Sequence, residues 1–510
     1  MNNSRFSNDI VINSKGLITY IMSDSFRIHY NHGLNKALEL CEMYSLELQI
    51  VLFRVKEENE RNNLFFTKGI SGYQGFLSKF TNNVYYFEET TDFFYKVLKK
   101  STTVIKDKAY LKEHLALQEK IQHFLDAENI IMTLVESNVV VPITYASNKE
   151  EYSARTIRPK IMSKINEFDD IIDFRGPTFL YEQKAKELLR YFIETNLNKY
   201  DQRSDPSKSL TSELSPYLKY GFISPLEIYK EVNLQTNPNK DSFIEELVVR
   251  RELAYNFIYY NKKYYDFDYM TYEWAYRTME NHSLDTREYI YTLKDYIAHN
   301  THDIYFNTAM KEMIYLGKMH GYMRMYWAKK IIEWSPNYHF AFETITYLNN
   351  YYFLDGNTPN GFNGIAWCFG KHDRAWAERL IFGKIRYMNA AGLKRKFDID
   401  ATISNAKPNS GHNAISKLNK IGKVYKVITQ NIDNLHQNSG ILSDDIIELH
   451  GNTTYAKCLD CEKRYELDLI KRLFESTNKP PYCEECKGII KTATISFGQP
   501  MPKNEMLRAE

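Results

Sequence analysis

Residues Thr301–Trp334 constrain the fold of this chain most, because they place aromatic, basic and polar side chains on closely spaced helical turns. The segment reads THDIYFNTAMKEMIYLGKMHGYMRMYWAKKIIEW, and beyond an Asp-Gly turn it is followed by the basic stretch GIAWCFGKHDRAWAERLIFGKIRYMN. A helical pocket that holds a flat cofactor and accepts an extruded nucleobase needs aromatic planes, guanidinium groups and few acids. We therefore expect such a pocket in a helical domain.

The strings GKMHGYMRMYWAKKIIEW and HDRAWAERLIFGKIRYMN resemble class II cyclobutane pyrimidine dimer photolyases, of the photolyase and cryptochrome family, almost residue for residue. The resemblance implies a light-dependent DNA repair lyase with FAD. In this reaction FADH⁻ absorbs near-UV or blue light, passes an electron to a flipped-out dimer and regains it after the ring splits. It also implies double-stranded DNA with pyrimidine dimers as partner, and leaves open an antenna chromophore of deazaflavin or folate type.

Length and composition limit the architecture and the compartment. A chain of 510 residues is too long for one core and suggests two or three domains. It has no apolar run of about 18 residues, and its N-terminus, MNNSRFSNDIVINSKG, lacks the apolar core of a secretory signal. We expect a monomeric intracellular protein in the nucleus or another DNA-containing compartment, without a membrane span.

Residues 1–160 alternate short apolar runs with helical patterns, which predicts a parallel, Rossmann-like α/β sheet. The predicted strands are LITYIMS, LQIVLFRV, NVYYFEE, TTVIKD and VVVPITYA. No G-x-G-x-x-G follows the first strand, so a dinucleotide site in the usual turn is not expected. The domain resembles the photolyase antenna domain. We expect a linker over 161–185, an all-α domain that binds FAD and DNA over 186–400, and a further segment over 401–510.

A run of small polar residues in the helical domain resembles the photolyase loop that binds the FAD phosphates. Hydroxyl groups just ahead of a helix can cap it and can donate to a pyrophosphate. The residues implied to bind the cofactor here are Tyr200, Thr211, Ser212, Glu213, Leu214 and Ser215, and Arg203 beside them is implied to contact DNA.

The segment Phe243–Asn261 predicts a long amphipathic helix with Leu247, Leu253 and Phe257 in the core. Glu246 on this helix resembles the family's catalytic carboxyl that contacts the pyrimidine dimer. We expect it in an apolar cleft, where a carboxyl group can stay protonated and donate to a base carbonyl.

Arg324 and Asp355 resemble an ion pair beside the flavin ring system, and this pair is implied to bind the cofactor. Asn349 resembles the catalytic amide that faces flavin N5, and Asn360 is a second candidate for that role. A neutral amide suits a reduced anionic flavin, because a carboxylate at the same place would repel it.

Met325 and Trp367 resemble side chains that line the dimer pocket, where stacking offsets part of the cost of unstacking the base. Arg374 and Arg386 resemble residues that fill the gap in the duplex and bind phosphates, and Trp367 also belongs to this DNA-contacting set. Both arginines lie in Lys371–Lys396, which holds eight Lys and Arg against two acids. A solvated helix face is the alternative, but interleaved aromatic residues favour a groove that faces a polyanion.

Trp327 and Trp334 lie seven residues apart, which is two helical turns on one face. They match the inner and outer members of the class II electron-transfer chain, but Phe306, with Tyr305 beside it, stands at the middle position. Phe is much harder to oxidise than Trp, so we expect poor flavin photoreduction and unaffected repair. A cryptochrome-like photoreceptor is one alternative function, and Phe306 disfavours it because light signalling usually needs photoreduction.

Residues 406–502 resemble the middle of a sirtuin, an NAD-dependent lysine deacylase, through AKPNSGH, TQNID, ELHG and FGQPMP. The resemblance places Asn431 and Asp433, with Gln430 in the same motif, at a nicotinamide pocket, and makes His450 the base that activates the ribose hydroxyl. The Gly-rich phosphate turn of sirtuins is absent upstream, so we expect an incomplete nucleotide fold. A bifunctional photolyase and deacylase is the second alternative.

Four cysteines form two C-x-x-C pairs with 21 residues between them, at Cys458, Cys461, Cys483 and Cys486. In a reducing compartment this spacing is typical of a metal site rather than of disulfides. Four thiolates without an open position predict a structural, tetrahedral Zn²⁺ site. We expect a vestigial zinc module rather than a second enzyme.

Overall fold

The computed structural model describes residues 5–12, 16–168, 171, 178–397, 408, 410–429, 434–449, 451–477, 479–494 and 503–509. The chain divides into two compact units, Met1–Ala390 and Ala391–Glu510. None of the helices in the described ranges has the length and apolar character that a membrane crossing needs.

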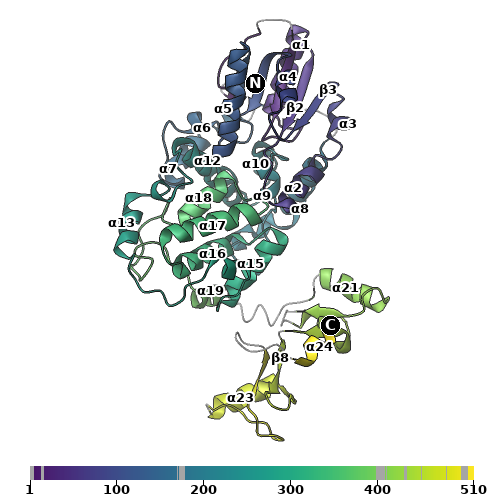
Figure 1. The fold of residues 1–510 in the computed structure, drawn as a ribbon, viewed down its shortest axis with the longest axis vertical. Helices are drawn as coiled ribbons and strands as arrows, with labels where there is room; N and C mark the ends of the chain where they lie inside the picture. The colour runs from purple at the N-terminus through teal and green to yellow at the C-terminus, as the bar shows by residue number, and fades with distance from the viewer. Residues whose placement is uncertain are drawn as a thin grey trace. The chain divides into compact units, whose positions relative to one another are not determined.

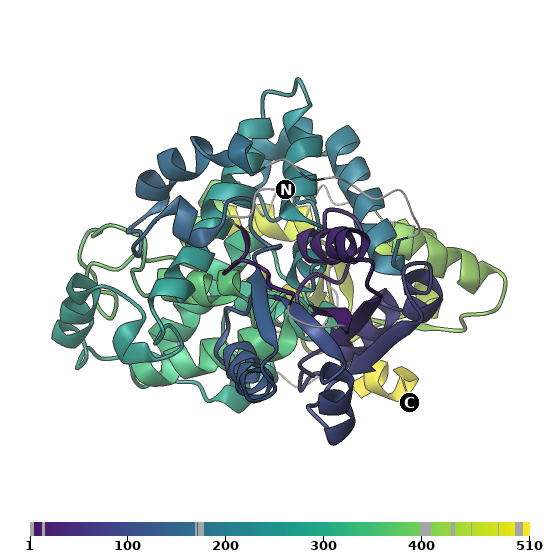
Figure 2. The same cartoon turned by 90° about the horizontal axis from the view of Figure 1, so that it is seen from above.

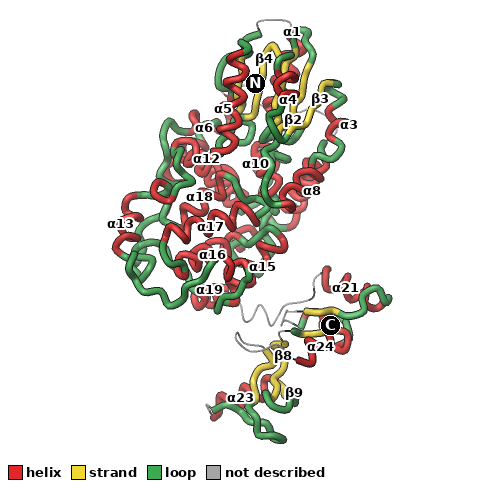
Figure 3. Tube along the Cα trace, viewed as in Figure 1, coloured by secondary structure: helices red, strands yellow, loops and turns green. Residues whose placement is uncertain are grey.

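Unit 1 contains a five-stranded parallel sheet in the order β3-β2-β1-β4-β5 (Figures 1 and 3). Alternate residues of each strand point to opposite faces. Ile18 and Tyr20 pack with side chains of α1 and α2, whereas Ile21 and Val51 pack with side chains of α4 and α5. Helices thus cover both faces of the sheet (Figure 2). The elements are β1 (Leu17–Met22), α1 (His32–Tyr44), β2 (Leu48–Phe53), α2 (Glu60–Gly69), α3 (Tyr73–Leu77), β3 (Asn83–Phe87), α4 (Asp92–Leu98), β4 (Ser101–Asp107), α5 (Lys112–Ala127) and β5 (Ile131–Val135).

The predicted parallel α/β sheet is confirmed, but one of its predicted strands is wrong. The fifth strand is Ile131–Val135, and the apolar run VVVPITYA instead forms a buried irregular segment and helix α6 (Ile143–Ala146). Pro142 stands directly before α6, where its fixed φ suits a helix start and its missing N–H would weaken a strand ladder. Val139–Val141 are apolar because they are buried against the helices, not because they pair in a sheet.

The rest of unit 1 is helical over the described residues, as the predicted all-α domain requires. Helices of this part cover one another in several layers (Figures 1 and 3). The main ones are α7 (Ala154–Met162), α8 (Leu180–Thr195), α9 (Ser215–Lys219), α10 (Pro225–Asn233), α11 (Lys240–Ile244), α12 (Arg251–Tyr260), α13 (Glu273–Asn281), α14 (Leu293–Ile297), α15 (Ile304–Leu316), α16 (Gly321–Trp334), α17 (Tyr338–Tyr352), α18 (Pro359–Cys368) and, at the boundary of the units, α19 (Ala390–Phe397).

Two arginines, Arg27 buried and Arg61 half-buried, join the sheet to the helices within unit 1. Arg27 donates from Nη1 to Asn138 Oδ1 at 2.8 Å and to the Gly221 carbonyl at 2.9 Å. Arg61 on α2 donates from Nη1 to the Ile314 carbonyl at 2.7 Å, in the last turn of α15. These contacts fix the loops at the carboxyl edge of the sheet against the helices that carry most of the predicted site residues.

Unit 2 contains two small sheets. β6 (Val427–Thr429) pairs in parallel with β7 (Ile446–Glu448), and β10-β8-β9 form an antiparallel sheet. The apolar cluster at the antiparallel sheet contains Cys458 and Cys483 beside only a few apolar side chains, so apolar burial alone supplies little stability there. The remaining elements are β8 (Gly451–Cys458), β9 (Arg464–Glu466), β10 (Ile490–Thr494), α21 (Ser410–Lys420), α22 (Leu435–Asn438), α23 (Leu467–Thr477) and α24 (Lys503–Ala509).

Candidate functional site

The turn between α17 and α18 is the centre of the candidate site, and it carries Asp355, the acidic member of an ion pair. Arg324 Nη2 lies 2.8 Å from Asp355 Oδ1, with the two side chains 30% and 16% exposed. The Arg324 guanidinium also lies 4.0 Å from the centroid of the Phe353 ring, and its Nε donates to the Met319 carbonyl at 3.1 Å. The structure thus brings the predicted pair together and holds the guanidinium plane in one orientation.

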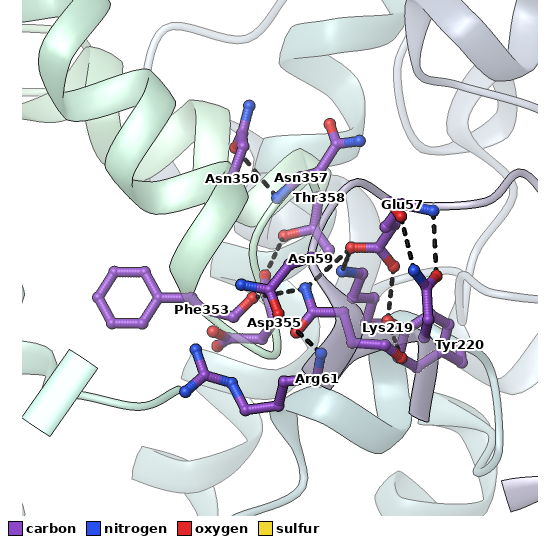
Figure 4. A network of polar contacts seen from close by, with 12 residues as sticks. Glu57, Asn59, Arg61, Lys219, Tyr220, Asn350, Phe353, Asp355, Asn357 and Thr358 are labelled. Atoms are coloured by element: carbon purple, nitrogen blue, oxygen red, sulfur yellow. Dashed lines mark hydrogen bonds and ion pairs between the residues drawn. The ribbon is translucent and has the colours of Figure 1, made fainter. Parts of the chain in front are cut away.

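Asn349 lies in the last turn of α17, next to this ion pair. Its side chain is nearly buried, and Nδ2 donates to Asn350 Oδ1 at 2.9 Å. A Cβ at Gly356 would lie 2.2 Å from the Asn349 carbonyl, so only glycine allows the turn to approach the helix this closely. Asn360, the second candidate for the amide beside the flavin, is exposed on α18. Figure 4 shows Asp355 in this turn.

A second cluster contains Glu246, and its surroundings differ from those predicted. Glu246 Oε1 lies 3.0 Å from Arg203 Nη2 and 3.4 Å from Arg250 Nε. The expected apolar cleft is therefore wrong, because two guanidinium groups face this carboxylate. Arg250 also lies over the Trp367 ring, 5.3 Å from its centroid, so one arginine links Glu246 to Trp367.

The segment around Glu246 is helical as predicted, and Leu247, Leu253 and Phe257 are buried as expected. Residues Glu245–Arg250 between α11 and α12 form a π-helical turn. Such turns occur frequently at functional sites because they widen the helix locally. Arg250 was not among the predicted site residues, although its spacing of four residues from Glu246 is a signal for an ion pair on one helix face.

The predicted phosphate loop has a different local geometry from the one expected. No side chain caps α9, and Thr211 Oγ1 instead donates to Glu213 Oε1 at 2.7 Å. Glu213 has a φ of 56°, and its Oε2 pairs with Lys318 Nζ at 3.2 Å. The hydroxyls therefore do not cap the helix. Tyr200 is buried beneath the Arg203 guanidinium, 4.6 Å from it, and the other members of the predicted loop are Ser212, Leu214 and Ser215, of which only Leu214 is buried.

His320 connects this loop to the helix that carries Arg324 and Met325. Its Nδ1 accepts from the Tyr322 backbone N–H at 3.2 Å, and its Nε2 donates to the Arg203 carbonyl at 2.8 Å. Burial lowers the pKa of His320, which favours the neutral ring that both contacts require. His320 was not among the predicted site residues. Its position directly before Gly321, the first residue of α16, is the sequence signal for a residue that caps the helix.

Aromatic side chains extend from the turn towards Trp334. The Trp327 ring lies 6.1 Å from the Phe353 ring, and Trp327 Nε1 donates to Met310 Sδ at 2.9 Å. Phe306 is fully buried, and its ring centroid lies 5.3 Å from that of Trp334. The residue at the middle position of the predicted chain is thus in contact with the outer tryptophan.

The guanidinium groups of Arg374 and Arg386 both lie close to the Trp376 ring. Their guanidinium carbons are 5.1 and 4.9 Å from the indole centroid, and Trp376 is 37% exposed. Lys371 does not belong to this exposed basic group, because it is buried and paired with Glu150. The predicted polyanion-facing groove over Lys371–Lys396 is therefore wrong in counting Lys371 among its exposed basic residues.

A cavity of about 570 Å³ opens at the carboxyl ends of β1, β2 and β4, between the sheet and the helices of unit 1. Its wall includes Asp24, His114, Tyr255 and Tyr351. On the sheet side, Asp107 Oδ2 accepts the backbone N–H groups of three consecutive residues, Ser23, Asp24 and Ser25, each at 3.0 Å. The Asp107 carboxylate therefore occupies the backbone N–H groups of the first βα turn, which a bound phosphate would need as hydrogen-bond donors.

The four predicted cysteines of unit 2 gather in one cluster. Their Sγ atoms all lie within 4.8 Å of one another, with 3.3 Å between Cys458 and Cys486 and 3.6 Å between Cys461 and Cys483. Tetrahedral Zn–S bonds of about 2.3 Å place sulfur atoms about 3.8 Å apart, so the cluster fits such an ion. A hydrogen bond from the Cys486 backbone lowers the pKa of the Cys483 thiol to about 6.

The sirtuin-like residues Gln430, Asn431, Asp433 and His450 lie outside the described residues. On the described side of the same segment, Glu448 accepts a hydrogen bond from Gln437 Nε2 at 2.5 Å and another from Asn452. The roles of the four residues stay predictions.

Solved structures with a similar fold are photolyases and cryptochromes. A bacterial class III photolyase from Agrobacterium tumefaciens superposes with a TM-score of 0.58 at 16% identity, over 78% of this chain and 87% of that chain. A cryptochrome from Synechocystis gives 0.57 at 14% identity, over 76% and 88%. Unit 1 therefore has the fold of the photolyase and cryptochrome class, and the predicted α/β and all-α parts are confirmed.

Curated relatives give the family. A deoxyribodipyrimidine photo-lyase from Methanothermobacter thermautotrophicus is 39% identical over 422 residues, covering 76% of this chain and 93% of that protein. A photo-lyase from Oryza sativa is 39% identical over 352 residues, covering 59% and 69%. The chain belongs to the deoxyribodipyrimidine photo-lyase family.

The C-terminal segment matches a second family. Residues 386–509 match the model of the Sir2 family. An NAD-dependent protein deacetylase from Rhodopseudomonas palustris is 52% identical over 116 residues, which is 23% of this chain and 46% of that protein. The predicted fusion of a photolyase with a sirtuin-like segment is confirmed, and the chain spans less than half the length of this deacetylase.

Proposed function

We propose that the protein repairs DNA in the light by splitting cyclobutane pyrimidine dimers, with FADH⁻ as the photoexcited electron donor. The observation that carries this function is the 39% identity over 93% of an archaeal deoxyribodipyrimidine photo-lyase. The site supports it, because Arg324 pairs with Asp355 in the turn that packs against the Asn349 carbonyl. When bound, the flavin supplies the electron that opens the dimer.

The residues at the turn fit a flavin ring system. The Arg324–Asp355 pair offers one cationic donor and one anionic acceptor, and Asn349 offers a neutral amide whose oxygen has no hydrogen-bond donor among the described residues. We assign the phosphate side of FAD to the loop of Tyr200, with Thr211, Ser212, Glu213, Leu214 and Ser215.

The dimer site is assigned to the cluster around Glu246. Its carboxylate can accept hydrogen bonds, and the flanking Arg203 and Arg250 can donate to carbonyl or phosphate oxygens. Trp367 on α18 and Met325 on α16 supply the flat and apolar walls against which an extruded base stacks. Arg374 and Arg386 contact the phosphates of double-stranded DNA.

Repair under light tests this function. We expect purified, FAD-loaded and chemically reduced protein to remove dimers from an irradiated oligonucleotide under blue light, and to leave them intact in the dark. Asp355→Ala should reduce flavin content and repair together, because it breaks the ion pair at the ring system. Dimers that persist in the light, with a known photolyase active in parallel, would contradict the proposal.

The exposed arginines predict a salt-dependent effect on DNA affinity. Arg374→Ala and Arg386→Ala should each weaken binding and reduce the slope of log affinity against log salt by about 0.9, if each neutralises one phosphate. Salt titrations of oligonucleotide binding measure both quantities. Arg277→Ala is a matched control, because Arg277 is exposed and already paired with Glu273 at 2.6 Å. An unchanged slope in both variants would make these arginines ordinary surface charges.

Phe306 predicts slow photoreduction of oxidised flavin in this protein. Its ring contacts Trp334 but is much harder to oxidise than an indole, so electrons should not pass readily between Trp334 and Trp327. Phe306→Trp should speed photoreduction in the presence of an external reductant, while dimer repair by the reduced protein stays unchanged. Transient absorption measures the first effect. Fast photoreduction of the parent protein would show that another route, such as one through Tyr305, replaces the missing tryptophan.

The cavity at the carboxyl edge of the sheet is the place we assign to an antenna chromophore. Its volume of about 570 Å³ is in the range of small-molecule sites, and several tyrosines line it. Because Asp107 takes the amides of the first βα turn, that turn offers no phosphate site. A flat chromophore of deazaflavin or folate type that lacks a pyrophosphate suits this wall.

The cysteine cluster of unit 2 is proposed to bind one Zn²⁺ that folds the surrounding sheet, since metal binding and folding are coupled in such sites. Cys458→Ser should remove the zinc found by metal analysis, whereas Cys41→Ser, outside the cluster, should retain it. We expect no NAD-dependent deacylation of an acetyl-lysine peptide, because no Gly-rich phosphate turn precedes the sirtuin-like motifs. Turnover that His450→Ala abolishes would contradict this and make the protein bifunctional.

A further inference from the structure

Two neighbouring asparagine side chains at the end of α17 have an orientation that their hydrogen bonds determine. Asn350 Oδ1 accepts from the Asn357 backbone N–H at 3.0 Å and from Asn349 Nδ2 at 2.9 Å. A backbone N–H can only donate, so the Asn350 atom that faces it must be the carbonyl oxygen. The Asn349 atom that faces the same oxygen must then be the NH₂ group. Figure 4 shows Asn350 facing the Asn357 backbone. The backbone at Asn357 thus sets the direction of the Asn350 amide and, through it, of the Asn349 amide.

The packing around Asn349 leaves its amide little freedom to turn over. A Cβ at Gly361 would lie 2.9 Å from Asn349 Nδ2, so α18 approaches the amide as closely as glycine allows. Asn349 is 5% exposed. Because Nδ2 is held by Asn350, Oδ1 points to the other side of the amide, where no described residue donates to it.

We propose that Asn350 is a positioning residue of the flavin site, which holds the Asn349 amide so that its oxygen faces flavin N5. The inference rests on the proposed flavin site. Reduced flavin carries an N5–H donor, whereas oxidised flavin has an N5 lone pair that accepts hydrogen bonds. An amide oxygen at this place accepts from the reduced form and repels the oxidised form. Asn350 therefore shifts the flavin equilibrium towards the reduced state, which is the state that repair uses.

Removing the acceptor on residue 350 tests the proposal through the flavin potential. Asn350→Leu keeps the branched shape of the side chain but cannot hold the Asn349 NH₂ group, so the amide can turn over and donate to oxidised N5. We expect the ratio of reduced to oxidised flavin at a fixed potential to fall about threefold to tenfold, the range for one net hydrogen bond. The midpoint potential should fall accordingly, and the reduced flavin should oxidise faster in air in the dark. Asn350→Ala replaces Asn350→Leu if the larger side chain prevents flavin binding.

Two controls separate positioning from general damage. Asn350→Asp retains an acceptor oxygen and should restore most of the parental potential, while Asn281→Ala, exposed at the end of α13, should leave it unchanged. In an Asn349→Ala background, Asn350→Leu should cause no further shift, because its effect passes through the Asn349 amide.

The possible outcomes distinguish a failure of the positioning role from a failure of the proposed function. A parental potential in Asn350→Leu, or an equal shift with and without Asn349, would overturn the positioning role and leave the proposed function intact. A parent protein that binds no FAD would overturn the proposed function and this inference with it.

Discussion

The ion pair between Arg324 and Asp355 holds the site together, because it joins the first turn of α16 to the turn that connects α17 and α18. At 2.8 Å it is a charge-assisted hydrogen bond, and with both side chains partly exposed it stabilises this arrangement by about 1.5 kcal/mol. Around it, His320 fixes the start of α16 and Gly356 allows the turn to lie against α17. Without the pair, only the Met319 carbonyl would orient the Arg324 guanidinium over the Phe353 ring.

Sequence patterns predicted the elements whose side chains alternate or repeat clearly. The parallel sheet, the helical domain and the buried positions of the helix that carries Glu246 follow from hydrophobic periodicity. The run VVVPITYA was misread as a strand, because an apolar segment without clear periodicity reports burial but not conformation. Lys371 was misread as a surface charge, since its partner Glu150 is distant in sequence and only the fold brings them together.

The polar contacts between the site residues were harder to predict than the identity of these residues. The resemblance named Glu246, but its two guanidinium partners depend on how the π-helical turn faces the loop of Arg203. Asn350 had no signal in the sequence, since its importance comes from one backbone N–H seven residues later. Such contacts arise from tertiary approach, and local propensity does not encode them. The four cysteines are the opposite case, because their spacing alone predicted the observed cluster.

The two units differ in what supports them. Unit 1 has two large apolar clusters that pack on both faces of its sheet, and the helices continue one of them. Among its described residues unit 2 has small clusters, one of which includes two of the cysteines, so a bound metal would supply much of its local stability.

A reduced flavin in unit 1 is proposed to transfer an electron to the dimer and to receive it back. Flash illumination of fully reduced protein with one equivalent of dimer-containing DNA, followed by flavin absorbance and dimer analysis, tests it most directly. We predict that dimers are split while the flavin returns to its reduced spectrum with no added reductant. Dimers that stay intact, or a flavin that remains oxidised by one electron for each dimer split, would contradict the account.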